Sequence, residues 1–137
     1  MTIAILLLSS LQLLAHEGHD NAPGALKSNH GGVVKSGKEI NLEYVVSGTE
    51  VKFYPISHEG KDLSVSDVAM EVTSKLPKGK AIALKTDVVA GVYTAQVDFK
   101  NAYRLEMNVE AKFQNKKSTF HYVIVVGDCF RLRFCLF

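Results

Sequence analysis

Apolar and polar residues alternate with a period of two along most of the chain after Lys38. The alternation is clearest in residues 40–46, 105–113 and 120–126. Successive side chains of a β-strand point to opposite faces, so this period predicts strands with one buried and one exposed face. No ten-residue window shows the apolar stripe of a helix. The pattern therefore predicts an all-β domain.

Turn residues separate the predicted strands. SGTE at 47–50 joins the first run to VKFYPI at 51–56, as in a hairpin. Further short strands are predicted at 68–75, 81–86 and 93–99. About seven strands of this kind predict two antiparallel sheets packed as an immunoglobulin-like β-sandwich. A small barrel is the alternative.

Four aromatic residues follow the strand alternation closely enough to predict core packing. They could also form a platform for a sugar or base, but their spacing favours the core. They are Phe53, Tyr54, Tyr93 and Phe99.

The N-terminal segment matches the hydrophobic region of a secretory signal. MTIAILLLSSLQLL carries no charged side chain and is shorter than the roughly 20 apolar residues of a membrane span. We predict a signal peptide over residues 1–15, cleaved after Ala15, and export to the periplasm. The alternative is an uncleaved segment that tethers the protein to the membrane.

Composition divides the rest of the chain into three parts. Residues 16–37 are rich in Gly, Asn, Ser and His and predict a flexible leader, followed by the β-sandwich at 38–126. The tail at 127–137 is either an added edge strand or an extension of the domain. Its cysteines, Cys129 and Cys135, can pair in an oxidising compartment, but a disulfide there would not join parts of the core.

Charge and motif content exclude several functions. The chain of 137 residues has 16 basic and 14 acidic residues, a net charge of +2, without a basic stripe that could neutralise nucleic-acid phosphates. It has no nucleophile elbow, no glycine loop for phosphate and no cysteine among catalytic partners. We therefore expect no nucleic acid, no small-molecule substrate and no enzymatic activity.

Metal-binding side chains are concentrated in the leader. The donors are His16, Glu17, His19 and Asp20, with His30 as a further ligand. Imidazole and carboxylate together suit divalent copper or zinc. Cleavage after Ala15 would add the α-amino group of His16 and favour Cu(II). We predict one weakly bound divalent metal ion.

Two other hypotheses remain open. In the first, the sandwich is a structural or adhesive module that binds a protein partner through its sheet edges, and the leader is only a solvated spacer. The second is oxidation by a copper ion at the N-terminus, which requires His58 or His121 close to that terminus.

Three segments carry a family resemblance: HEGHD, NHGGVVKSG and EINLEYVVSGTEVKFYPISHEGKDL. Together they resemble the small periplasmic β-sandwich domain of heavy-metal efflux systems, found alone or on the periplasmic adaptor subunits of resistance-nodulation-division pumps. The resemblance covers about residues 15–126.

The resemblance implies a periplasmic protein of Gram-negative bacteria that carries copper, zinc, cobalt or cadmium to a component of an efflux pump. His16, His19 and His30 match the family's His-rich leader, with Glu17 and Asp20 beside them. The chain lacks the helical hairpin and barrel of a full adaptor. The implied role is therefore that of a carrier, a buffer or an accessory module.

Overall fold

The computed structural model describes residues 26–125. The predicted signal peptide, the first part of the leader with four of the five predicted metal ligands, and the tail with both cysteines lie outside these residues. All regular elements in the described part are strands, and it contains no helix able to cross a membrane.

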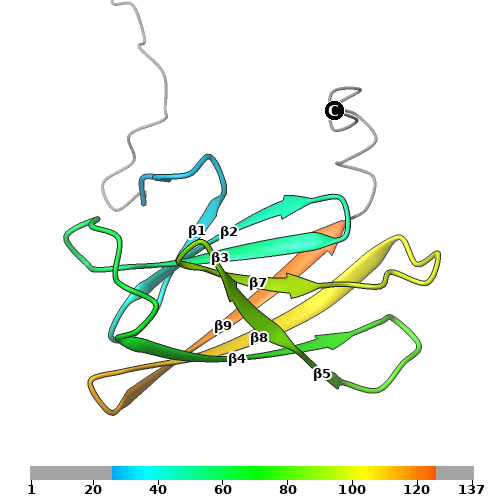
Figure 1. Cartoon of the computed structure of the whole chain (residues 1–137). Helices are drawn as coiled ribbons and strands as arrows, with labels where there is room; N and C mark the ends of the chain where they lie inside the picture. The colour runs from blue at the N-terminus through cyan, green and yellow to red at the C-terminus, as the bar shows by residue number, and fades with distance from the viewer. Residues whose placement is uncertain (1–25, 126–137) are drawn as a thin grey trace, which may run out of the picture.

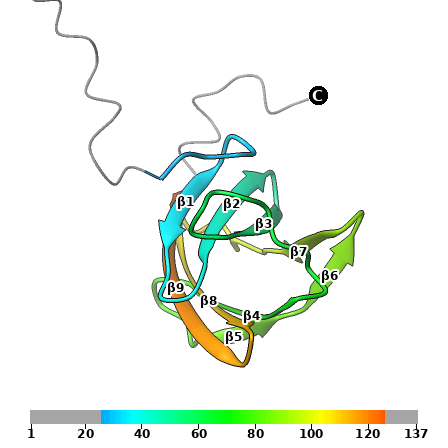
Figure 2. The ribbon, with the colours of Figure 1, turned by 90° about the vertical axis from the view of Figure 1, so that its left-hand side faces the viewer.

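Nine strands form two antiparallel sheets that pack face to face (Figures 1 and 2). The first sheet has the order β1-β2-β3-β7-β6 and the second β5-β4-β8-β9. Without β1, these orders are those of strands A-B-E-D and C′-C-F-G in immunoglobulin domains. This confirms the predicted sandwich and excludes the barrel. The strands are β1 (Val33–Ser36), β2 (Asn41–Ser47), β3 (Glu50–Ile56), β4 (Val68–Lys75), β5 (Ile82–Leu84), β6 (Thr86–Val89), β7 (Val92–Gln96), β8 (Arg104–Phe113) and β9 (Lys116–Val125).

The described residues form two strands more than the seven or so that the sequence predicts. The single strand expected at 81–86 is divided, because β5 pairs with β4 in the second sheet and β6 pairs with β7 in the first. Lys85 lies at the crossing between the sheets. Runs of three and four residues are too short for alternation to reveal such a change of sheet.

The other added strand, β1, corrects the predicted boundary of the leader. Residues 33–36 were assigned to a flexible segment, but they pair with β2 from Val33↔Tyr44 to Ser36↔Asn41. Three of these four side chains are exposed, so no buried face marks the strand in the sequence. The ordered domain therefore begins before Lys38.

The hairpin turns match the local sequence. Gly48 has a φ of 61° in the two-residue β2–β3 turn, and Gln114 and Asn115 have φ values of 50° and 62° between β8 and β9. Positive φ at one or both central residues is characteristic of the II′ and I′ turns, whose twist suits paired strands.

The core is formed by alternate residues of both sheets, as the pattern predicts. Leu105, Met107, Val109 and Phe120 are at most 2% exposed. Tyr122, 1% exposed, donates its hydroxyl hydrogen to the carbonyl oxygen of Leu42 at 3.0 Å and so connects β9 with β2 in the opposite sheet.

The prediction for the four aromatic residues is correct in part. Phe53 is completely buried, and Tyr93 and Phe99 pack against the core from its margin. Tyr54 was assigned to the core wrongly. It lies next to Phe53 on β3 and therefore on the outer face of the sheet, where its ring stacks on His30.

Candidate functional site

The candidate site is built around Glu43, a buried carboxylate on the outer face of the first sheet. Glu43 follows the core residue Leu42 on β2, so its side chain points away from the core. It is nevertheless 0% exposed, and it accepts hydrogen bonds from segment 28–32. The donors are Ser28 Oγ at 2.6 Å and the backbone N–H groups of Asn29, His30 and Gly32 at 3.0, 3.0 and 2.7 Å.

These hydrogen bonds determine the charge of Glu43. Burial by itself raises the pKa of the carboxyl group, but the donors from Ser28, Gly32, Asn29 and His30 outweigh burial and hold the pKa below its usual value. The group is therefore ionised at neutral pH. An anion held by several backbone N–H groups fixes the path of the segment that supplies them.

His30 is positioned by this segment. Its ring stacks on Tyr54, with ring centres 3.8 Å apart and planes at 13°. Its Nε2 lies 2.8 Å from Oδ2 of Asp62, and the two side chains are 30% and 51% exposed. The result is an accessible imidazole and carboxylate held side by side.

A second set of hydrogen bonds joins the two loops that carry this pair. Asn29 Nδ2 donates to the carbonyl oxygen of Gly60 at 3.0 Å and to Asp62 Oδ1 at 3.1 Å. The segment before β1 and the loop after β3 thus meet at one end of the sandwich (Figure 1).

Of the five predicted metal ligands, His30 alone lies among the described residues. It is not part of a flexible leader, because Glu43 anchors its backbone to the sheet. Asp62, its partner, was not selected from the sequence, since nothing local distinguishes it from other acidic loop residues. Within residues 26–125, no group of three or more His, Cys, Asp or Glu side chains could hold a metal ion. A complete site would require further ligands.

The other two described histidines lie elsewhere. His58 is in the turn after β3, with Nε2 3.3 Å from the carbonyl oxygen of Lys38. His121 is exposed on β9 in the second sheet, with Nδ1 2.8 Å from Asn108 Oδ1. The N-terminus that a copper-dependent oxidase would use lies outside the described residues, so that hypothesis stays a prediction.

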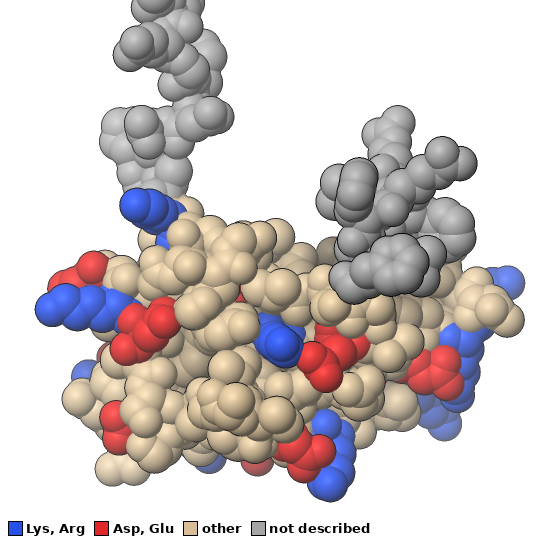
Figure 3. Space-filling view, turned by 45° about the horizontal axis from the view of Figure 1, so that its top comes forward, with Lys and Arg blue, Asp and Glu red and all other residues tan. Residues whose placement is uncertain are grey.

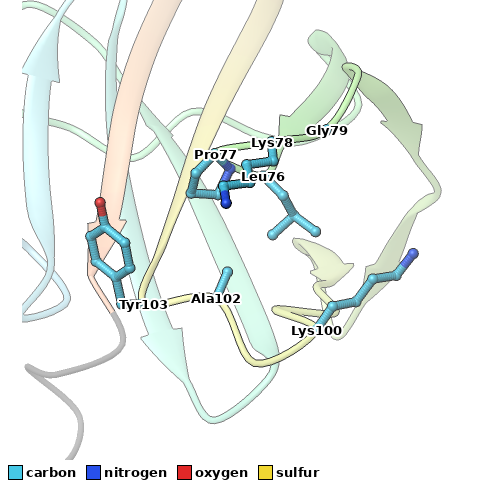
Figure 4. Close-up of a pocket in the computed structure, with 7 residues that line it drawn as sticks. All are labelled: Leu76, Pro77, Lys78, Gly79, Lys100, Ala102 and Tyr103. Carbon is cyan, nitrogen blue, oxygen red and sulfur yellow. The ribbon is translucent and has the colours of Figure 1, made fainter.

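Neither the charge pattern nor the hollow beside the β4–β5 turn adds a candidate metal site among the described residues. Basic and acidic side chains are interspersed over the face in Figure 3. A hollow of about 380 Å³ lies between the β4–β5 turn and the β7–β8 loop, where Leu76 extends toward Ala102 (Figure 4). Its lining includes neither a carboxylate nor an imidazole, so it offers no ligand of the kind that the pair provides.

Comparison with known proteins supports the fold alone. No family model and no curated protein sequence matches this chain. Among solved structures, a DUF4426 family protein from Pseudomonas aeruginosa is similar, with a TM-score of 0.56 and 16% sequence identity, over 69% of this chain and 96% of that one. At this identity the two proteins share a fold, and the similarity does not extend to function.

Proposed function

We propose that the protein is a periplasmic accessory protein that reversibly binds a divalent metal ion of the copper or zinc class and buffers it or passes it to an efflux system. The observation that supports this function is the accessible pair of His30 and Asp62. His30, one member of the pair, lies ten positions after the end of the predicted donor cluster at 16–20.

The spacing of the pair is close to what a shared ion requires. Nitrogen and oxygen ligands bound at about 2.0–2.2 Å in tetrahedral geometry lie about 3.3 Å apart. His30 Nε2 and Asp62 Oδ2 are 2.8 Å apart, so a separation of roughly half an ångström would admit an ion. The displacement is small because both side chains are partly exposed.

The remaining ligands are those predicted in the leader. His30 lies eleven positions after His19, and a chain of eleven steps reaches up to about 36 Å. His16, Glu17, His19 and Asp20 can therefore return to the pair. Ordering such a segment costs conformational entropy, which lowers the affinity and favours release. Protons compete for imidazole near about pH 6, so binding should weaken on acidification.

Calorimetric titration of the mature protein with Cu(II) and Zn(II) tests this function. We expect His30→Ala or Asp62→Asn to weaken metal binding about tenfold or more. We expect the same of the joint replacement of His16 and His19 by alanine. His121→Ala is the matched control, because this imidazole is also exposed and hydrogen-bonded but lies on the other sheet. Binding weaker than about millimolar, or equal loss in the control, would refute the proposal.

A specific observation also favours the adhesive module as a second candidate. Ile82, Val88 and Val89 are 56%, 52% and 58% exposed, and they lie on β5 and β6, end strands of the two sheets that Lys85 connects. Free edges with apolar side chains are suited to pairing with another chain. This candidate requires no metal, so the titration distinguishes the two.

A further inference from the structure

The hollow of about 380 Å³ lies at the end of the sandwich opposite the His30 and Asp62 pair. The loop that carries Asp62 leads into β4, and the hollow lies where β4 ends (Figures 1 and 4). A second hollow of about 280 Å³ adjoins it, because Leu76, Gly79 and Lys100 line both. The volume of the first hollow is within the range of small-molecule sites.

Apolar side chains line the first hollow from two loops. Leu76 and Pro77 come from the β4–β5 turn, and Ala102 and Tyr103 come from the β7–β8 loop (Figure 4). Leu76 also packs against the core, so the hollow borders the margin of the space between the sheets. Tyr103 is 68% exposed. An alkyl chain lying on this surface would remove it from water, which is favourable.

Three lysines surround this apolar surface. Lys78 and Lys100 line the first hollow, and Lys80 and Lys100 line the second. All three are exposed, and none forms an ion pair with a carboxylate of residues 26–125. The second lining also includes Asp98, whose Oδ1 accepts the backbone N–H of Lys100 at 2.9 Å. Three lysines and one aspartate leave a net charge of +2, which is complementary to an anion.

We propose that the first hollow binds a free fatty acid, an amphiphile with one alkyl chain of medium length and one carboxylate. The alkyl chain packs on Leu76, Pro77 and Ala102, and the carboxylate faces the lysines. A concave site encloses a single chain, whereas a membrane surface is met by the protruding apolar face of an element. The molecule is bound and not converted. The site uses none of the proposed metal ligands and stands independently of the metal-binding function.

Nuclear magnetic resonance of the full-length mature protein tests this site. The probes are decanoate, octanoate and decyltrimethylammonium, which has the same chain length as decanoate and a positive charge, each below the concentration at which it forms micelles. We expect decanoate to shift the amide signals of residues 76–80 and 99–103 to saturation. Octanoate lacks two methylene groups and should bind roughly tenfold more weakly. The cation should also bind at least tenfold more weakly. No shifts with decanoate, or equal affinity for decanoate and the cation, would overturn the proposal.

Charge variants separate this site from general attraction to a basic protein. Joint replacement of the three lysines of the hollows by glutamine should weaken decanoate at least tenfold. The matched control replaces three lysines that are also exposed and without an ion pair but line neither hollow, and it should bind as the wild type does. These are Lys38, Lys61 and Lys112. An equal loss in the two triple variants would contradict the proposal.

A variant of the apolar wall tests where the chain lies. Ala102→Phe places a ring in the hollow and should weaken decanoate several-fold. Unchanged affinity in a folded Ala102→Phe would contradict the proposal, and the lysine variants test the site if this one fails to fold. Sedimentation with phosphatidylglycerol vesicles distinguishes a free fatty acid from a membrane. Binding to these vesicles without saturable shifts by decanoate would overturn the proposal in favour of a lipid surface.

Discussion

At the scale of single residues, Glu43 contributes most to the candidate site. A carboxylate with 0% exposure would be strongly destabilising if it had no partners, and here one hydroxyl and three backbone N–H groups satisfy it. Because its pKa is lowered in the folded protein, its contribution to stability is complete above the usual value of 4.5 and is lost as the pH falls through the folded value.

Glu43→Gln should therefore change both the stability and its pH dependence. The neutral amide cannot accept as many hydrogen bonds, and we expect a loss of about 2 kcal/mol at neutral pH. The loss should shrink as the pH falls from about 4.5 through the folded pKa of Glu43, because protons then bind the unfolded wild-type chain more readily than the folded one. Denaturant unfolding of both proteins, at pH values from neutral to below about 4.5, measures this loss of stability. Glu71→Gln is the control, because Glu71 is exposed on β4. A constant difference at every pH would show that ionisation of Glu43 plays no part.

At the scale of elements, the entry into β1 depends on a close approach at Gly32. A Cβ atom there would lie 2.2 Å from the carbonyl oxygen of Tyr44 and 2.8 Å from Cγ2 of Val45. The nearest of these atoms belongs to the backbone of β2, so it cannot move aside without displacing that strand. The segment that carries His30 can therefore lie flat on the sheet only because residue 32 has no side chain.

Gly32→Ala should lift this segment and cost about 2–4 kcal/mol. Gly48→Ala is the comparison, because Gly48 has open space around it but a φ of 61°, so strain alone should cost about 1–2 kcal/mol. The ring-current shift of His30 over Tyr54 should disappear in Gly32→Ala and persist in Gly48→Ala. Retention of that shift in Gly32→Ala would disprove the close approach.

At the scale of the whole molecule, side chains connect the two sheets along the edge formed by β1 and β9 (Figure 2). Lys35 on β1 donates to the carbonyl oxygen of His121 and lies over the ring of Tyr122. Glu39 donates its N–H to Ser118 Oγ at 2.9 Å. Together with the bond from Tyr122 to Leu42, these contacts join one pair of sheet edges, while β5 and β6 at the other pair are joined by the chain itself at Lys85.

Tyr122→Phe should weaken the whole sandwich. The change leaves the carbonyl oxygen of Leu42 without this buried donor, and we expect a loss of about 1–2 kcal/mol in the free energy of unfolding. Tyr103→Phe is the control, because Tyr103 is 68% exposed and should change stability by less than about 0.5 kcal/mol. Equal effects in the two variants would mean that the bond between the sheets contributes nothing.

The sequence by itself determined the strands and the core faces. Alternation along β3, β8 and β9 identified Phe53, Val109 and Tyr122 as buried, because the direction of a strand side chain depends on local backbone geometry. The Gly48 turn was equally readable, since its backbone requirement is local.

Tertiary structure decided which sheet each of the short strands β1, β5 and β6 joins, because these strands are too short to show a period. It also decided the site. His30 and Asp62 are 32 positions apart, and Glu43 appears in the sequence as one more polar residue on an exposed strand face. Their meeting depends on one loop covering the outer face of a sheet and on another loop reaching it. Contacts between distant loops leave no periodic signal, so the fold could be predicted from this chain and the geometry of its site could not.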